Sequence, residues 1–411
     1  MVSRSWWFRS SLACLAILAA GMVAAFTRSA SEPVAQTDPV LKGRQLVMEY
    51  ACGGCHGGPD PAAAGWLAGV QRPDQEFLIG PCAFEKGAQP CFRTRPRNLT
   101  PDNETGLGKY SERQIFNALR YGLRPGETPD IEITSSTPGQ GNFPANPKYL
   151  APPMPWTAWR HISDEELKAI AAYLKRGVKP VSNKVADSDA PPDFWAGGYH
   201  PDSIGPRPAL PFPTQHENAP QRTFDVAKVI RGRDMVIQHD CGACHGGGGN
   251  PAKQGWLAGT VPGPFESFPI GACAIEPGAQ PCFMTRPRNL TPDNTTGMGR
   301  FSERQIFNAL RFGLRPGETA DVEISSSTPG QGNFPEEPKY LAPPMPWPAL
   351  RHMSDADLWA VAAYLKYGLR PVSNKVKDSD GPPDFWASGY AVQAIGKHPA
   401  PPFPTANEVR R

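Results

Sequence analysis

The sequence predicts an all-α, loop-rich protein built from two tandem copies of one domain. Ten-residue blocks recur along the chain, as in PKYLAPPMPW at 147–156 and again at 338–347. Apolar residues recur at helical spacing inside each copy, and no run of alternating apolar and polar residues indicates a strand. Gly (41) and Pro (49) together exceed a fifth of the 411 residues, which implies long loops between the helices.

The repeat sets the expected domain boundaries. Further matching blocks are TRPRNLTPDN at 94–103 and 285–294, SERQIFNALR at 111–120 and 302–311, and PPDFWA at 191–196 and 382–387. All of these pairs share an offset of 191 residues, as a tandem duplication requires. We expect the first domain at 38–199 and the second at 224–411. The Pro-rich stretch at 200–223 is typical of a semi-stiff linker.

Each copy is expected to contain three main helices. The pairs occupy 39–50 and 226–239, 111–123 and 302–314, and 163–177 and 354–368. In the second pair, Ile115, Phe116 and Leu119 lie on one face. Ser163 can cap the third helix, with Glu166 three residues later as a capping box.

Two pentapeptides carry the strongest chemical signal. They read CGGCH at 52–56 and CGACH at 241–245, and both match the signature for covalent attachment of haem c. The spacing lets two thiols reach the vinyl groups on one porphyrin edge, while the histidine lies beneath the iron. A redox CxxC pair has no need of the adjacent histidine, and a zinc site needs further ligands. The expected haem-binding residues are Cys52, Cys55 and His56, with Cys241, Cys244 and His245.

A methionine is the expected sixth ligand of each iron. Met154 is the only methionine between His56 and the linker, and the repeat pairs it with Met345. Both stand in APPMPW, where the flanking prolines restrict the backbone and lower the cost of ordering a weak iron–thioether bond. A methionine that only fills the core is the plainer alternative. The rival ligands His161 and His352 lie seven residues later, at the start of the third helix, where a polar side chain is ordinary.

The four other cysteines of the repeats form two matching pairs, each nine residues apart. In an oxidising compartment this spacing predicts one local disulfide per domain, Cys82–Cys91 and Cys273–Cys282. Pairing across the domains remains formally possible, as does a catalytic disulfide or a thiolate haem ligand.

The N-terminal segment, 1–30, has the pattern of an export signal or a membrane anchor. Arg4 and Arg9 precede an uncharged stretch that is at the short end for a membrane span, and Cys14 lies inside that stretch. We therefore expect a periplasmic protein, soluble or anchored to the inner membrane. The rest of the chain is balanced in formal charge, so nothing indicates nucleic-acid binding.

Other residues shared by the two copies suit a haem site less specifically. Four arginines lie where they could meet haem propionates or solvent, and four tryptophans could wall the haem pockets or simply fill the core. They are Arg95, Arg97, Arg286 and Arg288, and Trp66, Trp156, Trp256 and Trp347.

With these motifs the chain resembles the class I c-type cytochromes. The likeness rests on the CxxCH segments, the NLTPD…TGxG stretches at 98–108 and 289–299, and the MPW segments followed by a terminal helix. This style is similar to the cytochrome c subunits of bacterial membrane-bound alcohol and sugar dehydrogenases. The resemblance implies a helical fold packed around each haem and an electron-transfer role. The cysteine loops and the long Pro/Gly stretch before each methionine depart from the pattern, and those subunits often carry three haems.

Electron transfer without substrate chemistry is therefore the expected function. The partners would be redox proteins: a dehydrogenase, an oxidase or another cytochrome. A dihaem enzyme, such as a peroxidase or a sulfur-compound oxidase with one open or switchable haem, is the main alternative. A module that docks a dehydrogenase or oxidase, with electron transfer as its output, is the third hypothesis.

Overall fold

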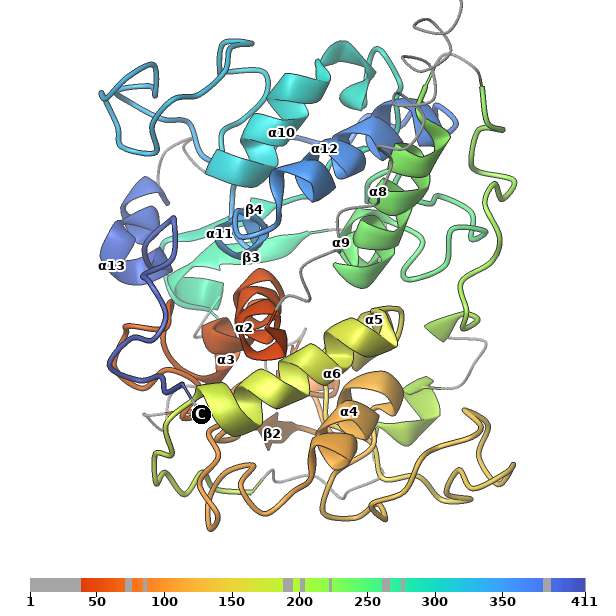
Figure 1. The fold of residues 1–411 in the computed structure, drawn as a ribbon. Coiled ribbons are helices and arrows are strands. Elements are labelled where there is room, and N and C mark those ends of the chain that lie inside the picture. The colour runs from red at the N-terminus through yellow and green to blue at the C-terminus, as the bar shows by residue number, and fades with distance from the viewer. Residues whose placement is uncertain are drawn as a thin grey trace, which may run out of the picture. The chain divides into compact units, whose positions relative to one another are not determined.

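In each repeat of the computed structural model, the helix that leads into the CxxCH segment crosses the last long helix. α2 (Pro39–Glu49) packs on α6 (Asp164–Ala172), and α8 (Val226–Gln238) packs on α12 (Asp355–Ala363) (Figure 1). A glycine stands at each crossing, Gly43 in α2 and Gly232 in α8. A Cβ at either position would overlap a backbone carbonyl of the facing helix, so the close approach requires glycine.

The structure describes residues 38–70, 76–83, 87–187, 195–199, 204–221, 224–260, 267–274, 278–379 and 386–410. From Pro39 onward the chain packs into one compact unit. The expected signal or anchor at 1–30, including Cys14, lies outside the described residues. Within the described ranges, no helix has both the length and the apolar character that a membrane crossing requires.

The remaining helices follow the local sequence signals. α4 (Glu112–Tyr121) and α10 (Glu303–Phe312) begin with complete capping boxes, Ser111 with Gln114 and Ser302 with Gln305. α6 is capped by Ser163, whose hydroxyl accepts the Glu166 N–H and bonds to its carboxylate, and then continues through one π-helical turn, Tyr173–Gly177. α12 continues likewise through Tyr364–Gly368. The short helices are α3 (Cys52–His56), α5 (Trp156–Trp159), α9 (Cys241–His245), α11 (Trp347–Leu350) and α13 (Val392–Ile395).

The all-α expectation requires a correction, because the fold is helix-rich but contains a few strands. β1 (Phe77–Ile79) pairs antiparallel with β2 (Phe92–Thr94), and β3 (Phe268–Gly271) pairs with β4 (Cys282–Thr285). In each hairpin a disulfide joins the two sides, Cys82 to Cys91 and Cys273 to Cys282. Strands of three or four residues are too short to show alternation in a sequence, which is why they were not expected.

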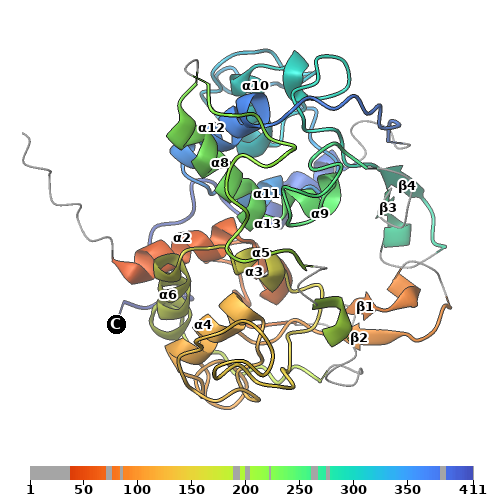
Figure 2. The ribbon, with the colours of Figure 1, turned by 90° about the vertical axis from the view of Figure 1, so that its right-hand side faces the viewer.

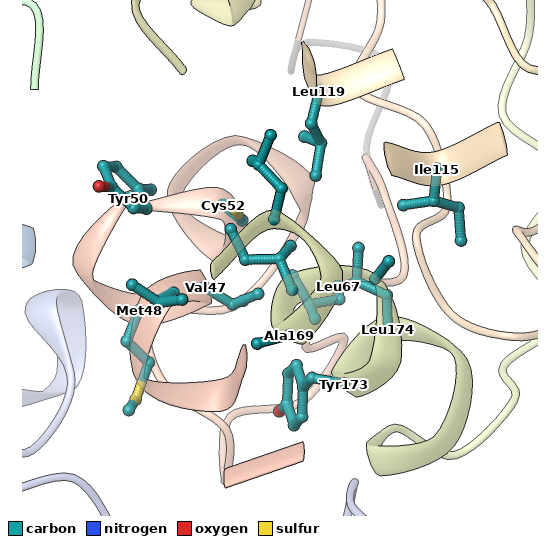
Figure 3. Packing of buried hydrophobic residues seen from close by; sticks show 14 of the residues in the cluster. Val47, Met48, Tyr50, Cys52, Leu67, Ile115, Leu119, Ala169, Tyr173 and Leu174 are labelled. Atoms are coloured by element: carbon teal, nitrogen blue, oxygen red, sulfur yellow. The ribbon is translucent and has the colours of Figure 1, made fainter. Parts of the chain in front are cut away.

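Each repeat has its own apolar core between its three long helices. Figure 3 shows Val47 and Leu67 packed among side chains of α2, α4 and α6 in the first repeat. The matching core of the second repeat includes Val236 and Leu257. In Figure 2, α2, α4 and α6 form one group and α8, α10 and α12 another. The CxxCH segment of each repeat therefore sits at the end of a helix that its own core holds in place.

The two repeats meet directly beside these segments. Tyr50, two residues before Cys52, stacks on His239, two residues before Cys241, with ring centres 4.7 Å apart. The Tyr50 hydroxyl bonds to the side-chain oxygen of Gln238 (3.1 Å), and His239 Nε2 lies 3.2 Å from Glu49 Oε1. Equivalent positions of the duplication thus face one another at the junction.

Candidate haem-binding site

The CxxCH segments form short helices, α3 and α9, that place the two cysteines and the histidine close together. Cysteines three residues apart lie on one side of a helical turn, and the histidine follows on the same turn. The residue before each helix, Ala51 or Asp240, has a positive φ of 55° or 53°. This left-handed backbone is costly for residues other than glycine. The same strain at the same position in both repeats shows that the sharp entry into the segment is a fixed feature of the fold.

The histidine of each segment is held in one orientation. His56 Nδ1 lies 2.7 Å from the carbonyl oxygen of Arg97, and His245 Nδ1 lies 2.7 Å from that of Arg288. A carbonyl can only accept, so Nδ1 carries the proton and Nε2 is left as the basic nitrogen. Burial lowers the pKa of both histidines. A neutral ring with an anchored Nδ1–H is the form that binds a metal through Nε2.

The other readings of a CxxC pair fit this geometry poorly. Burial raises the pKa of the Cys52 and Cys241 thiols to about 12. A redox-active pair instead needs a lowered thiol pKa. A zinc site needs about four ligands, and among the described residues no cluster of three or more His, Cys, Asp or Glu side chains could hold a metal ion.

A buried tryptophan supports each segment from behind. A Cβ on Gly53 would overlap the Trp66 ring, and one on Gly242 would overlap the Trp256 ring, so both glycines are needed for contact. The loop that carries Trp66 is bonded to the histidine itself, because Gly69 N–H donates to the His56 carbonyl (2.7 Å). Two of the four expected pocket tryptophans, Trp66 and Trp256, therefore pack directly against the candidate haem-binding segments.

Each candidate methionine lies half-buried against the core of its own repeat. Met154 packs on the core of the first repeat and Met345 on that of the second, each two residues before the first residue of a short helix, α5 or α11. Met345 also lines an apolar cavity of about 310 Å³ together with Gly53, Gly54 and Trp66 of the first repeat. The methionine loop of the second repeat thus lies beside the CxxCH segment of the first.

The rival ligands His161 and His352 lie at the junction between the repeats. His161 lines a cavity of about 880 Å³ that it shares with residues of α8, and His352 lines the smaller cavity beside Met345. Burial, reinforced by the neighbouring Arg160 or Arg351, lowers the pKa of both rings to about 3. Both histidines are therefore neutral.

The candidate propionate-binding arginines are paired with protein groups. Arg97 bonds to the Val185 carbonyl (2.9 Å) and the Asp187 carboxylate (2.5 Å), and Arg288 bonds likewise to Val376 and Asp378. Arg95 bonds to Glu76 and to the Asp187 carbonyl. Arg286 donates to the Asp378 carbonyl (2.8 Å). These contacts pin the segment that follows the third helix against the loop that anchors the histidine.

Sequence reasoning missed the groups that stand behind Trp66 and Trp256. The indole N–H of each tryptophan donates to a buried tyrosine hydroxyl, Tyr173 (3.0 Å) or Tyr364 (2.9 Å). Both tyrosines occupy matched positions of the duplication. The sequence signal that could have found them is the recurrence of a tyrosine at the same position of both copies.

These observations agree with covalent haem c in both repeats. A pair of unlinked thiols, an anchored neutral histidine and a half-buried methionine occur twice in the same relation to the fold. The donor set is the one that class I haem attachment uses.

Sequence comparisons find relatives with this chemistry. A gluconate 2-dehydrogenase cytochrome c subunit from Pantoea cypripedii is 28% identical over 330 residues, which cover 73% of this chain and 59% of that protein. A fructose dehydrogenase cytochrome subunit from Gluconobacter japonicus is 23% identical over 347 residues, 80% of this chain and 52% of that protein. The cytochrome c subunit of a quinone alcohol dehydrogenase from Gluconacetobacter polyoxogenes is 29% identical over 278 residues, 67% and 47%. No family model matches the chain.

The chain spans about half to three-fifths of the length of these curated relatives. Each of the three is named as the cytochrome or cytochrome c subunit of a dehydrogenase. The chain is therefore similar in sequence to cytochrome subunits of three dehydrogenases.

Proposed function

We propose that this chain is a dihaem cytochrome c that passes electrons from a dehydrogenase to a respiratory acceptor. Each repeat would form one cytochrome c-like domain around one haem c. The protein would work in the periplasm, soluble or anchored through its N-terminal segment. The observation that carries the proposal is the anchored histidine of each CxxCH segment, His56 on the Arg97 carbonyl and His245 on the Arg288 carbonyl.

Each group of the site has a defined task. The thiols of Cys52 and Cys55, and of Cys241 and Cys244, would form the thioether links to the porphyrin edge. His56 and His245 would each offer Nε2 to the iron, with the Nδ1–H bond fixing the ring. Met154 and Met345 would complete the axial pairs. A bound haem supplies the one-electron ferric/ferrous couple, with a potential that His/Met ligation raises.

The two sites have the same candidate cysteines, histidine and methionine. We therefore propose two axial ligands for each iron, with no open coordination position. The methionine loops share their sequence, their partial burial and their place before a short helix. This similarity favours a carrier over a dihaem enzyme with one switchable haem. The relatives, each named as a dehydrogenase cytochrome subunit, point to a dehydrogenase as the donor.

Haem content and ligation can be tested on the purified protein. We expect two haems per chain by the pyridine haemochrome assay, and the far-red methionine-to-iron charge-transfer band of the ferric form at the intensity of two haems. Replacing Cys241 and Cys244 together by Ala should lower the count to one. A count other than two, a half-intensity band, or steady turnover of peroxide or thiosulfate would contradict the proposal.

A further inference from the structure

The segment that follows each repeat packs on the other repeat. Residues 204–221 follow the first repeat, but Thr214 Oγ1 donates to the Pro251 carbonyl (2.9 Å) and Asn218 Nδ2 to the Leu369 carbonyl (2.7 Å). Residues 396–410 match 205–219 at the 191-residue offset and follow the helices of the second repeat, within the range expected for its domain, but Thr405 Oγ1 donates to the Pro61 carbonyl of the first repeat (2.7 Å). We call these two segments the tails. Their contacts are equivalent, so the two repeats exchange tails reciprocally.

Each tail inserts one glutamate into the opposite repeat. Glu408 is 2% exposed, and its Oε1 lies 2.6 Å from both Arg44 Nε and the Tyr173 hydroxyl. Its other oxygen accepts the Thr405 N–H (3.0 Å). Both oxygens of this buried carboxylate are thus hydrogen-bonded, and a guanidinium lies beside it.

The tail that follows the first repeat makes nearly the same contacts through Glu217. Glu217 is fully buried, with Oε1 2.6 Å from Arg233 Nε and 2.6 Å from the Tyr364 hydroxyl. Because Glu408 and Glu217 have the same contact geometry, we infer that the exchange of tails is a feature of the repeat unit that was duplicated.

The buried glutamate connects through two hydrogen bonds to the back of the candidate haem segment. Tyr173 donates to Glu408 and accepts from the Trp66 indole, which packs against Gly53 inside CGGCH. Burial and the carboxylate raise the pKa of Tyr173 well above its usual range, so this tyrosine remains the donor. The chain Glu408–Tyr173–Trp66 therefore ties the tail of the second repeat to the haem segment of the first.

A second link runs through the helix that precedes the segment. Arg44, which the Glu408 carboxylate holds, lies in α2, and α2 leads directly into α3. Its guanidinium also donates to the tail carbonyl of Pro401 (2.6 Å). The tail thus fixes both the helix before the CxxCH segment and the tryptophan behind it.

We propose that each haem site is completed by the tail of the other repeat, with Glu408 positioning the first site and Glu217 the second. This inference rests on the proposed function, because it assumes a haem in each repeat. It follows that each haem site depends on the tail that follows the other repeat. A change near the C-terminus disturbs the N-terminal haem site, and a change between the repeats disturbs the C-terminal one.

The test uses two parent variants of the full-length holoprotein, Met345→Leu and Met154→Leu. In the first, the far-red band reports only the site of the first repeat, and in the second only the other site. Each parent then receives Glu408→Gln or Glu217→Gln, and imidazole, which displaces a methionine ligand, is titrated while the band is followed. The Gln variants keep the side-chain shape and remove the charge.

The expected result is crossed. Glu408→Gln should make imidazole bind roughly tenfold more tightly in the Met345→Leu parent, the effect of losing one strong hydrogen bond, and leave the Met154→Leu parent unchanged. Glu217→Gln should do the reverse. If Glu408→Gln does not fold, Asn407→Ala provides a milder change in the same tail, because it removes only the neutral bonds to the Pro61 and Ala63 carbonyls. It should tighten imidazole binding in the Met345→Leu parent by a smaller factor.

An effect confined to the repeat that precedes the altered tail, an equal effect in both parents, or no effect would overturn the inference. A band that is absent from the parents, or a haem count below two, would instead refute the proposed ligands or haems. The two failures are therefore distinguishable.

Discussion

The two CxxCH segments have the same backbone conformation, but the residues that precede them differ in charge. Ala51 and Asp240 hold the same position before the first cysteine, with φ of 55° and 53°. Next to them, Tyr50 corresponds to His239 and Glu49 to Gln238. The groups that we propose to bind and orient a haem are the same in both repeats. The groups that set the electrostatic environment have changed.

Asp240 is the most consequential of these differences. Burial raises the pKa of its carboxyl to about 7, whereas the first repeat has no ionisable group at this position. Asp also adopts the left-handed backbone more readily than Ala. The acidic side chain therefore suits the strained turn while it places a titrating charge beside the second site.

The largest expected effect tests how tightly the shared scaffold is packed. Gly53→Ala should lower the free energy of unfolding by about 3 kcal/mol, because the new Cβ meets the Trp66 ring and lies 2.5 Å from the Gly58 carbonyl oxygen. Gly54→Ala is the matched control, since its Cβ would meet only Ala51 Cβ at 3.9 Å and the second repeat carries Ala243 there. Denaturant unfolding of the holoproteins measures both, and equal losses would contradict the packing argument.

The repeat, the long helices and the chemical motifs were predictable from the sequence because each depends on neighbouring residues. The Ser111–Gln114 box and the 163–177 helix are local patterns of this kind. The hairpins at 77–94 and 268–285 escaped because their strands are too short. Glu217 lies in a stretch whose proline content predicted a stiff linker. Its partner Tyr364 is 147 residues away in the chain, and composition does not show which surface such a segment packs on.

The candidate site likewise has one part that the sequence predicts and another that it does not. Spacing alone makes the cysteines and the histidine the candidate haem-binding residues, and the repeat makes Met154 and Met345 the candidate sixth ligands. The Arg97 carbonyl that anchors His56, and the burial that shifts Asp240, are products of tertiary packing. No motif encodes them, so only the structure shows why the two sites differ electrostatically.

The next prediction concerns the pH dependence of stability. The folded pKa of Asp240 is raised, so the stability of the protonated form is fully present below the ordinary pKa near 4 and is lost as pH rises through about 7. Between about pH 5 and about pH 8 the loss should be about 2–3 kcal/mol. Asp240→Asn keeps the turn and should remove this loss. The check is denaturant unfolding of both proteins at the two pH values, and parallel pH profiles would refute the assignment.

The same charge should separate the two reduction potentials. An ionised Asp240 would stabilise the ferric form of a haem bound at the second site, and a charge of this kind contributes about 1 kcal/mol, on the order of 50 mV for a one-electron couple. Above about pH 7 the second haem should therefore have the lower potential. Spectroelectrochemical titration should show the two waves approaching each other in Asp240→Asn and on acidification of the wild type.

The reverse exchange provides the control for this prediction. Ala51→Asp should lower the potential of the first haem, while the neutral Ala51→Asn should leave it near its original value. If Ala51→Asn shifts the potential as far as Ala51→Asp does, then the backbone strain of the turn controls the potential and the charge does not.

The smallest expected effect lies where the two repeats touch. Tyr50→Phe removes the hydroxyl that bonds to Gln238 but keeps the ring stacked on His239 and edge-on to Trp159. The loss should be about 1 kcal/mol, the net value of one buried hydrogen bond. A double-mutant cycle with Gln238→Leu isolates this bond from the one that Gln238 donates to the His161 carbonyl. A coupling energy near zero would mean that the bond between the Tyr50 hydroxyl and Gln238 adds no stability to the junction, which the stacked rings and the exchanged tails would then hold without it.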